Sequence, residues 1–202
     1  METVLPTKQK VLRWKRMDDG PHKKNATYAD IEALPEGKVG QLIDGDLYIC
    51  GRPRVLHSLA MTRLLSGLAV ANRDPAPKGW VILFEVEIWF GKNRKNLLVP
   101  DIAGWRRSRM PEIPDVQTFA LPPDWVCEGL SPSTQRIDRG RKRELYAKFG
   151  VKHLWYADAD RKEVEMLVLD GASYRIAKVA TSEHGVFAPF THEIDLAMLW
   201  TR

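Results

Sequence analysis

Cysteine is scarce in this chain, and its scarcity excludes several kinds of site. Cys50 and Cys127 are the only cysteines among 202 residues, so they cannot form a disulfide framework. No second cysteine or histidine stands at zinc-finger spacing from either residue. We therefore interpret both as buried thiols.

Long apolar runs are also missing. The longest helix-like apolar stretch, Leu64 to Ala71, is far shorter than the roughly 20 residues that cross a bilayer. Met1 to Lys10 lacks the apolar segment of a secretory signal. With 44% hydrophobic and 28% charged residues, the composition is that of a globular protein. We expect a cytoplasmic protein with no membrane partner.

The motifs of three common enzyme classes are absent. The five histidines never form an HExxH pair, which argues against a zinc hydrolase, and no glycine-rich phosphate loop indicates an NTPase. Ser131-Pro132-Ser133 lacks the Gly-x-Ser-x-Gly elbow of a serine hydrolase. A turn followed by a helix cap explains these serines better.

Positive charge is in modest excess. The net charge of +5 suits a polyanionic partner, although it raises the expectation of nucleic-acid binding only slightly. Lysines and arginines concentrate in residues 1–26, which we predict to be a flexible basic arm. A solvated tail explains it better than a nucleic-acid-binding arm. Residues 27–202 would then form a single domain.

Hydrophobic periodicity predicts alternating helices and strands along that domain. Asp44-Gly45 and Asp170-Gly171 are typical of hairpin turns. The order predicts an α/β (α+β) fold with a mixed central sheet flanked by helices, an added N-terminal helix and hairpin, and a C-terminal hairpin. The expected helices span residues 27–34, 55–72 and 137–149, and the expected single strands span 80–90, 97–105, 125–130 and 153–157.

Three residues in the middle of the chain suit metal-dependent phosphodiester cleavage. Asp101 and Glu128 each stand at or near the end of an apolar strand, and Lys142 follows on the next helix. Mg²⁺ is commonly held by a few carboxylates together with water and substrate oxygens. An ammonium group beside them can orient water or stabilise developing charge. Glu87 is a candidate third acid, favoured over Glu85.

Each of these residues also has a simpler explanation. Lys142 lies four residues after Asp138, so the two can form an ordinary ion pair on a solvated helix face. On spacing alone this explanation is preferred. Asp101 can be a turn former after proline and Glu128 an exposed strand end, and each alternative is about as probable as a metal role.

An ordered set of short segments nevertheless resembles one family. Over residues 27–170 the chain is similar to the Uma-two family of restriction-endonuclease-like proteins. The matching segments, in order, are Thr27 to Asp30, Leu34 to Gly37, Leu42 to Gly45, Pro53 to His57, Val99 to Asp101, Glu128 to Thr134, Asp138 to Gly140 with Lys142 and Tyr146, and Gly150 to Trp155.

The resemblance implies a place in the PD-(D/E)XK nuclease superfamily, whose core is a mixed sheet flanked by helices. Asp101 would be the acid of the PD motif and Glu128 the second acid. The wider superfamily has a lysine two residues after the second acid, where this chain has Leu130. Lys142 matches the helix position from which the family takes its lysine. Glu87 matches an acidic position in the strand before the PD motif.

Two further positions follow from the resemblance. Many relatives have glutamate where this chain has Gln41, and a neutral amide lacks the charge of a metal-binding carboxylate. His57 follows the family's pattern near the start of its helix. A lone histidine there is more often a hydrogen-bonded structural residue, and a phosphate contact is the other interpretation.

We therefore hypothesise a Mg²⁺-dependent endonuclease, in which Mn²⁺ can substitute, with Asp101, Glu128 and Glu87 as metal ligands and Lys142 as the charge-stabilising group. DNA is favoured over RNA as the partner, and a homodimer is one option. The alternative is a catalytically silent nuclease fold that binds nucleic acid or protein, which Gln41 and Leu130 favour. The expected phosphate contacts are Arg106, Arg107, Arg139, Arg141 and Arg143.

Overall fold

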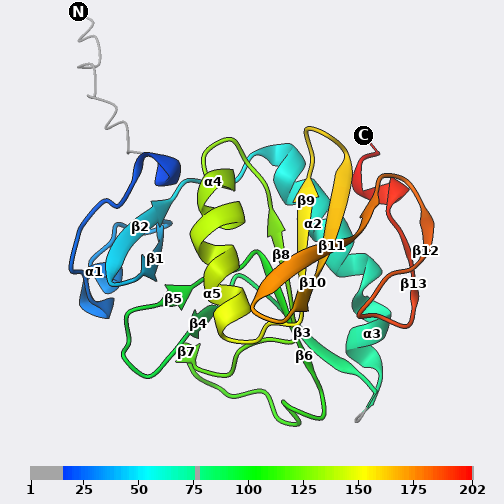
Figure 1. The fold of residues 1–202 in the computed structure, drawn as a ribbon, viewed down its shortest axis with the longest axis horizontal. Helices are drawn as coiled ribbons and strands as arrows, with labels where there is room; N and C mark the ends of the chain where they lie inside the picture. Colours follow the sequence, from blue (N-terminus) through cyan, green and yellow to red (C-terminus); the bar gives the residue numbers. More distant parts are fainter. Residues whose placement is uncertain (1–15, 76–77, 202) are drawn as a thin grey trace, which may run out of the picture.

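The computed structural model describes residues 16–75 and 78–201. Within them the strands form a six-stranded sheet, a five-stranded sheet and a two-stranded hairpin (Figure 1). Most of the predicted basic arm, residues 1–15, lies outside the described residues. In the described part of the chain, no helix is long and apolar enough to cross a bilayer.

The six-stranded sheet has the order β11-β10-β9-β8-β6-β3. β8 and β9 run parallel, and the other neighbours are antiparallel. In the central strands β9, β8 and β6 nearly every side chain is buried, as expected where a sheet is covered on both faces. The strands are β3 (Trp80–Phe84), β6 (Ile102–Arg106), β8 (Trp125–Gly129), β9 (His153–Asp158), β10 (Glu163–Asp170) and β11 (Ser173–Ala180).

One face of this sheet is covered by α2 (Val55–Gly67) and α3 (Ala69–Arg73), and α4 (Gln135–Ile137) and α5 (Arg143–Lys148) cross the other face (Figure 1). Trp155 is at the centre of the first face. Its ring packs edge-on against Trp125 and Phe190, with centroids 5.4 Å and 5.7 Å away. Phe190 comes from the C-terminal segment, so that segment completes the core.

The five-stranded sheet has the order β2-β1-β5-β4-β7. Its first hairpin turns at Asp44 and Gly45, whose φ angles of 54° and 87° are those of the two central residues of a type I′ turn. The short helix α1 (Tyr28–Glu32) begins with a capping box, in which the Thr27 N–H donates to Asp30 Oδ2 at 2.9 Å. The strands are β1 (Val39–Ile43), β2 (Asp46–Cys50), β4 (Glu87–Trp89), β5 (Leu97–Leu98) and β7 (Thr118–Phe119).

The two long strands predicted over residues 80–90 and 97–105 are each broken in the middle. Glu85 has a φ of 47°, which is unusual for a residue other than glycine, and Pro100 has no N–H to donate to a ladder. The N-terminal half of the first strand and the C-terminal half of the second stay in the six-stranded sheet, while the other halves join the five-stranded sheet. The Glu85 N–H donates to the Asp101 carbonyl at 3.2 Å, which ties the two breaks together.

The predicted fold class is confirmed: the structure is a mixed α+β fold with helices against mixed sheets, an N-terminal helix and hairpin, and the β10–β11 hairpin. The continuation beyond β11 was not predicted. It forms a second small hairpin and a short 3₁₀ turn, made of β12 (His184–Val186), β13 (Glu193–Asp195) and η3 (Ala197–Leu199).

The described part of the predicted basic arm packs against β2. After the turn η1 (Met17–Asp19), the N–H groups of His22 and Ala26 donate to the carbonyls of Leu47 and Gly45, both at 2.7 Å. Met17 is 2% exposed. The N-terminal lobe, which consists of the five-stranded sheet with α1 and η1, therefore includes residues before 27.

We expect Trp155→Ala to lower the free energy of unfolding by about 3–5 kcal/mol, because it removes the ring at the centre of the aromatic cluster and leaves a cavity. Guanidinium denaturation measures this change. Arg175→Ala, on the exposed side of β11, should stay within about 0.5 kcal/mol of the wild type. Equal effects of the two substitutions would show that Trp155 is not a central core residue.

Candidate active site

A cleft of about 680 Å³ lies where the two sheets meet. Its walls come from β1, the loop after β2, the start of α2, the ends of β3 and β8, and the helical segment after Thr134. Three residues proposed from the sequence, Asp101, Glu128 and Lys142, all line it. The structure therefore brings together the central part of the predicted site.

Asp101 and Glu128 come from neighbouring strands. Ile102 pairs with Cys127, so continuing the antiparallel register by one residue places Asp101 opposite Glu128. Asp101 Oδ2 accepts a hydrogen bond from the Gly129 N–H at 2.7 Å, which locks the two strand ends together. The Asp101 side chain remains 23% exposed, whereas Glu128 is buried. One carboxylate thus faces the open cleft and the other forms its inner wall.

Glu128 belongs to a buried ion cluster. Lys142 Nζ lies 2.6 Å from Glu128 Oε1 and 3.1 Å from Asp138 Oδ1, and the Lys142 side chain is only 2% exposed. The Tyr146 hydroxyl donates to the same Glu128 oxygen at 2.5 Å. The ion pair between Asp138 and Lys142 that spacing suggested therefore exists, but it is buried and shared with Glu128.

The helical segment that carries Lys142 has an irregular turn at this point. Between α4 (Gln135–Ile137) and α5 (Arg143–Lys148), residues Asp138–Lys142 are π-helical, where an uninterrupted α-helix was predicted. A π-helical turn leaves backbone groups that need other partners. The Tyr156 hydroxyl supplies one by donating to the Asp138 carbonyl at 2.9 Å. This turn directs both Asp138 and Lys142 toward the cleft.

The charges in the cluster are unbalanced. Glu128 and Asp138 contact the ammonium group of Lys142, and Asp101 lies opposite Glu128 on the neighbouring strand. Burial raises the pKa of the Glu128 carboxyl to about 8 against the opposing effect of Lys142, and Asp138 and Asp101 raise it further. Burial also raises the pKa of Asp138. The pKa of Lys142 is raised as well, because the neighbouring carboxylates outweigh its burial. In their ionised forms the three acids outnumber Lys142, and a cation bound beside Glu128 would favour its ionised form.

His57 reaches the cleft from the start of α2. Its Nε2 lies 3.2 Å from Asp101 Oδ1, so it orients the carboxylate that Gly129 holds from the other side. The pKa of His57 is raised because the contact with Asp101 outweighs the effect of burial. A Cβ atom on Gly129 would lie 2.4 Å from the imidazole Cε1, so only glycine fits there. This geometry agrees with the interpretation of His57 as a hydrogen-bonded structural residue.

The two departures from the family pattern have clear surroundings. Gln41 lines the cleft, accepts the Val99 N–H at 2.9 Å and donates to the Cys50 sulfur at 3.1 Å. Leu130 is buried in the core between the helix and the sheet. A lysine at that position would have to enter the core, whereas Lys142 reaches Glu128 from the helix.

The structure does not bring Glu87 to the cleft. Its carboxylate accepts a hydrogen bond from the Tyr28 hydroxyl at 2.8 Å, on the five-stranded sheet. Glu85, the less favoured of the two acids, lines the cleft instead. The break at Glu85 is the reason, because it changes which side chains of this segment face the cleft. Burial and then Asp101 raise the pKa of Glu85.

None of the five arginines expected to contact phosphate lines the cleft. Each is held by other parts of the fold. Arg106 stacks over Trp80, and Arg107 donates to the carbonyls of Asn72 and Trp80. Arg139 pairs with Glu165, Arg141 with Asp44 and Glu144, and Arg143 donates to the Tyr174 carbonyl.

Other cations surround the opening of the cleft. Arg16, Lys38, Arg52 and Arg54 line it. Arg54 pairs with Asp160 at 2.8 Å, and Arg16 donates to the Pro132 carbonyl across the opening. Sequence reasoning missed these residues because they belong to loops and to the arm. The dense run Arg52-Pro53-Arg54 before α2 was the available signal.

The carboxylates of the cleft can supply only part of the coordination shell of Mg²⁺. Among the described residues, no three His, Cys, Asp or Glu side chains are grouped closely enough to hold a metal ion by themselves. Mg²⁺ needs no such set, since one or two carboxylates commonly hold it while water and substrate oxygens complete the octahedron. The adjacent carboxylates of Asp101 and Glu128 meet that requirement.

The fold matches that of a family of restriction-endonuclease-like proteins. The family model of the Uma2 proteins, described as "Putative restriction endonuclease", matches residues 26–198. The chain therefore belongs to this family, as the resemblance in the sequence indicated.

A solved structure has the same fold. It is a protein of Anabaena variabilis, described as "a putative nuclease belonging to DUF820", with 20% sequence identity and a TM-score of 0.68. The alignment covers 86% of this chain and 97% of that one. No curated protein matches the chain.

The raised pKa of Glu128 predicts a pH-dependent stability. Its ordinary value is 4.5, so between about pH 4.5 and pH 8 the folded state holds a proton that the unfolded chain has released. This contribution to the free energy of unfolding is lost as the pH rises through that window, at up to roughly 1.4 kcal/mol per pH unit. Glu128→Gln removes the titrating group.

We expect the stability of the wild type to fall relative to Glu128→Gln between pH 5 and pH 8. Urea denaturation in the presence of EDTA measures both proteins without bound metal. Parallel pH profiles would show that Glu128 titrates alike in the folded and unfolded chain.

Proposed function

We propose that this protein is a Mg²⁺-dependent endonuclease that hydrolyses phosphodiester bonds, with DNA as the expected substrate. One observation carries the proposal. This chain belongs to the family, and in its cleft Asp101 lies beside Glu128 while Lys142 is 2.6 Å from the Glu128 carboxylate. An ordinary surface ion pair does not account for a lysine that is only 2% exposed and contacts two buried acids.

In this proposal Asp101 and Glu128 hold the metal, and Glu85 replaces Glu87 as the additional acid of the cleft. When bound, Mg²⁺ supplies a water of lowered pKa and positive charge beside the phosphate. His57 and the Gly129 N–H orient Asp101 from opposite sides. Lys142 and Tyr146 hold the Glu128 carboxylate in one position.

The substrate backbone is proposed to enter past Arg52 and Arg54. Both are exposed and line the cleft, so they replace the five arginines first expected to contact phosphate. Such contacts position a nucleic acid without reading its sequence.

A catalytically silent binding module is the second candidate. Two observations favour it: Gln41 places an amide in the cleft, and burial favours the protonated form of Glu128, which is a weaker metal ligand. Metal binding measured near neutral pH distinguishes it from the enzyme.

The first test is Asp101→Asn, which keeps the shape of the side chain and removes its charge. We expect Mg²⁺ and Mn²⁺ binding by calorimetry to be lost and cleavage of plasmid DNA to fall by about 100-fold or more. Glu87→Gln is the matched control, since it also removes one carboxylate from a neighbouring strand but lies outside the cleft.

Glu87→Gln should leave cleavage within about twofold of the wild type, because the proposed ligands are untouched. A folded wild type that binds neither metal at millimolar concentration would support the silent module. Equal losses in the two variants would contradict the assignment of Asp101.

Gln41→Glu tests whether the amide limits the metal site. The glutamate can keep the hydrogen bond from the Val99 N–H and adds a negative charge to the cleft. We expect Mg²⁺ affinity to rise by about tenfold, on the scale of changes to residues around a metal site. Calorimetry at pH 7.5 measures this affinity, and an unchanged value would exclude position 41 from the site.

A further inference from the structure

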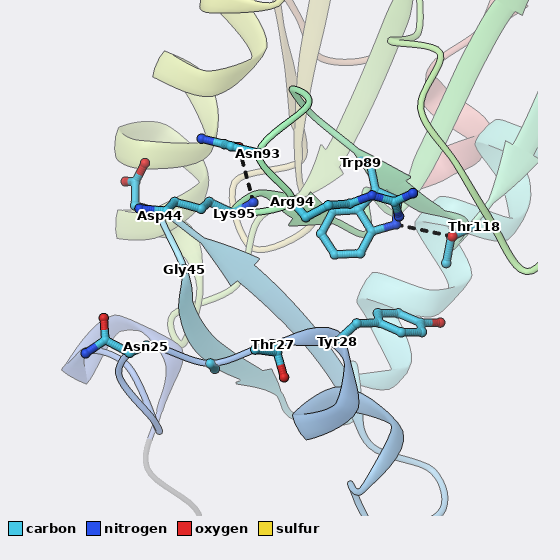
Figure 2. A pocket seen from close by; sticks show the side chains of 11 residues that line it. Asn25, Thr27, Tyr28, Asp44, Gly45, Trp89, Asn93, Arg94, Lys95 and Thr118 are labelled. Carbon is cyan, nitrogen blue, oxygen red and sulfur yellow. Dashed lines mark hydrogen bonds between the residues drawn. The ribbon is translucent and has the colours of Figure 1, made fainter.

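A second pocket, of about 600 Å³, lies in the N-terminal lobe (Figure 2). Residues 25–28 form one side of it, and the turn between β4 and β5 forms the other, with Trp89 between them (Figure 2). It shares no lining residue with the cleft described above. The proposed nuclease mechanism makes no use of it.

The pocket carries positive charge without matching acids. Arg94 and Lys95 line it and are exposed, and neither forms an ion pair with an acid in the described part of the chain. Lys92 stands in the same turn. Asp44 is the one acid in the lining, and Arg141 already pairs with it at 2.5 Å. The open charges therefore suit an anionic ligand.

The same pocket presents flat groups. The Arg94 guanidinium carbon lies over the Trp89 ring, 4.8 Å from its centroid, in a cation–π contact. The Tyr28 ring is 5.8 Å from Trp89, and Glu87 fixes its hydroxyl. The Trp89 N–H is satisfied by the Thr118 hydroxyl at 3.2 Å. The platform is thus formed in the absence of ligand.

We propose that this pocket binds an unpaired nucleotide of a nucleic-acid strand, with the base against Tyr28 and Arg94 and the phosphate near Lys95. Stacking surfaces combined with positive charge are how proteins hold single strands without reading sequence. This inference rests on the proposed function, because it says that the nucleic-acid substrate is unpaired where it meets this pocket. The Asn25 and Asn93 side chains at the rim can add hydrogen bonds to a base or sugar.

β1 sets the spacing between the pocket and the cleft. Gln41 lines the cleft, and Gly45, four residues later, lines the pocket. Gly45 lies in the turn that follows β1, so a strand rise of about 3.3 Å per residue makes roughly 13 Å an upper limit on the distance between these two backbone positions. One strand can therefore occupy both places.

Fluorescence anisotropy tests the proposal with a labelled 12-nucleotide single-stranded DNA in EDTA, where binding is measured without cleavage. We expect Arg94→Ala to raise the Kd by about fivefold or more, because a stacking partner and a charge are lost together. Lys178→Ala is the matched control. It removes a cation that also lies over a ring, Phe187 at 5.0 Å, on β11 of the other sheet. Its Kd should change by less than about twofold.

An oligonucleotide of equal length without bases separates stacking from charge. We expect it to bind the wild type more weakly, and Arg94→Ala to affect it less than the intact strand. Equal effects of Arg94→Ala on both strands would overturn the nucleotide assignment and leave a phosphate site. If Arg94→Ala and Lys178→Ala raised the Kd equally, net charge alone would explain the binding, and the pocket would not be the binding site.

Two further measurements complete the test. Tyr28→Phe should bind as the wild type and Tyr28→Leu more weakly, with circular dichroism to confirm folding. Adenosine monophosphate should bind at least about tenfold more weakly than the strand, and tighter binding would assign the pocket to a free nucleotide. Asp101→Asn should keep strand binding, so a failure of the pocket and a failure of the nuclease proposal can be distinguished.

Discussion

The buried contact between Lys142 and Glu128 is the interaction on which the site depends. Removing an ammonium and a carboxylate from water costs several kcal/mol for each ion, so the pair is tolerated only with close geometry and further hydrogen bonds. Tyr146 and Asp138 supply them. The π-helical turn at Asp138–Lys142 and the register of β8 are both needed to bring these groups together. The helix and the sheet are therefore locked to each other at the point where the chemistry is proposed to occur.

The second constraint is the exchange of strands between the two sheets. Two predicted strands each contribute one half to the six-stranded sheet and the other half to the five-stranded sheet. The breaks occur at Glu85, which has a left-handed φ angle, and around Pro100. Because the sheets separate there, a cleft opens at the breaks, and Asp101 and Glu85 line it. Unusual backbone geometry at a site of this kind agrees with the general clustering of strain near functional residues.

The arginines show how the fold redistributes charge. Arg139, Arg106 and Arg143 use their planar donor groups to tie neighbouring elements together, and so they are not free for phosphate. Arg52 beside the cleft, and Arg94 and Lys95 around the second pocket, form no ion pair in the part of the chain that the structure describes.

Local patterns in the sequence determined the elements, the capping box at Thr27 and the type I′ turn at Asp44-Gly45, because these depend on neighbouring residues. The ordered motifs indicated the family and predicted a site at Asp101, Glu128 and Lys142, which the fold brings to one cleft. Only the tertiary structure decided that Glu85 rather than Glu87 faces the cleft, since the break at Glu85 separates two side chains that an unbroken strand would place on the same face. It also decided which arginines are free, because an ion pair such as Arg139 with Glu165 joins residues far apart in the chain, which no local pattern reveals.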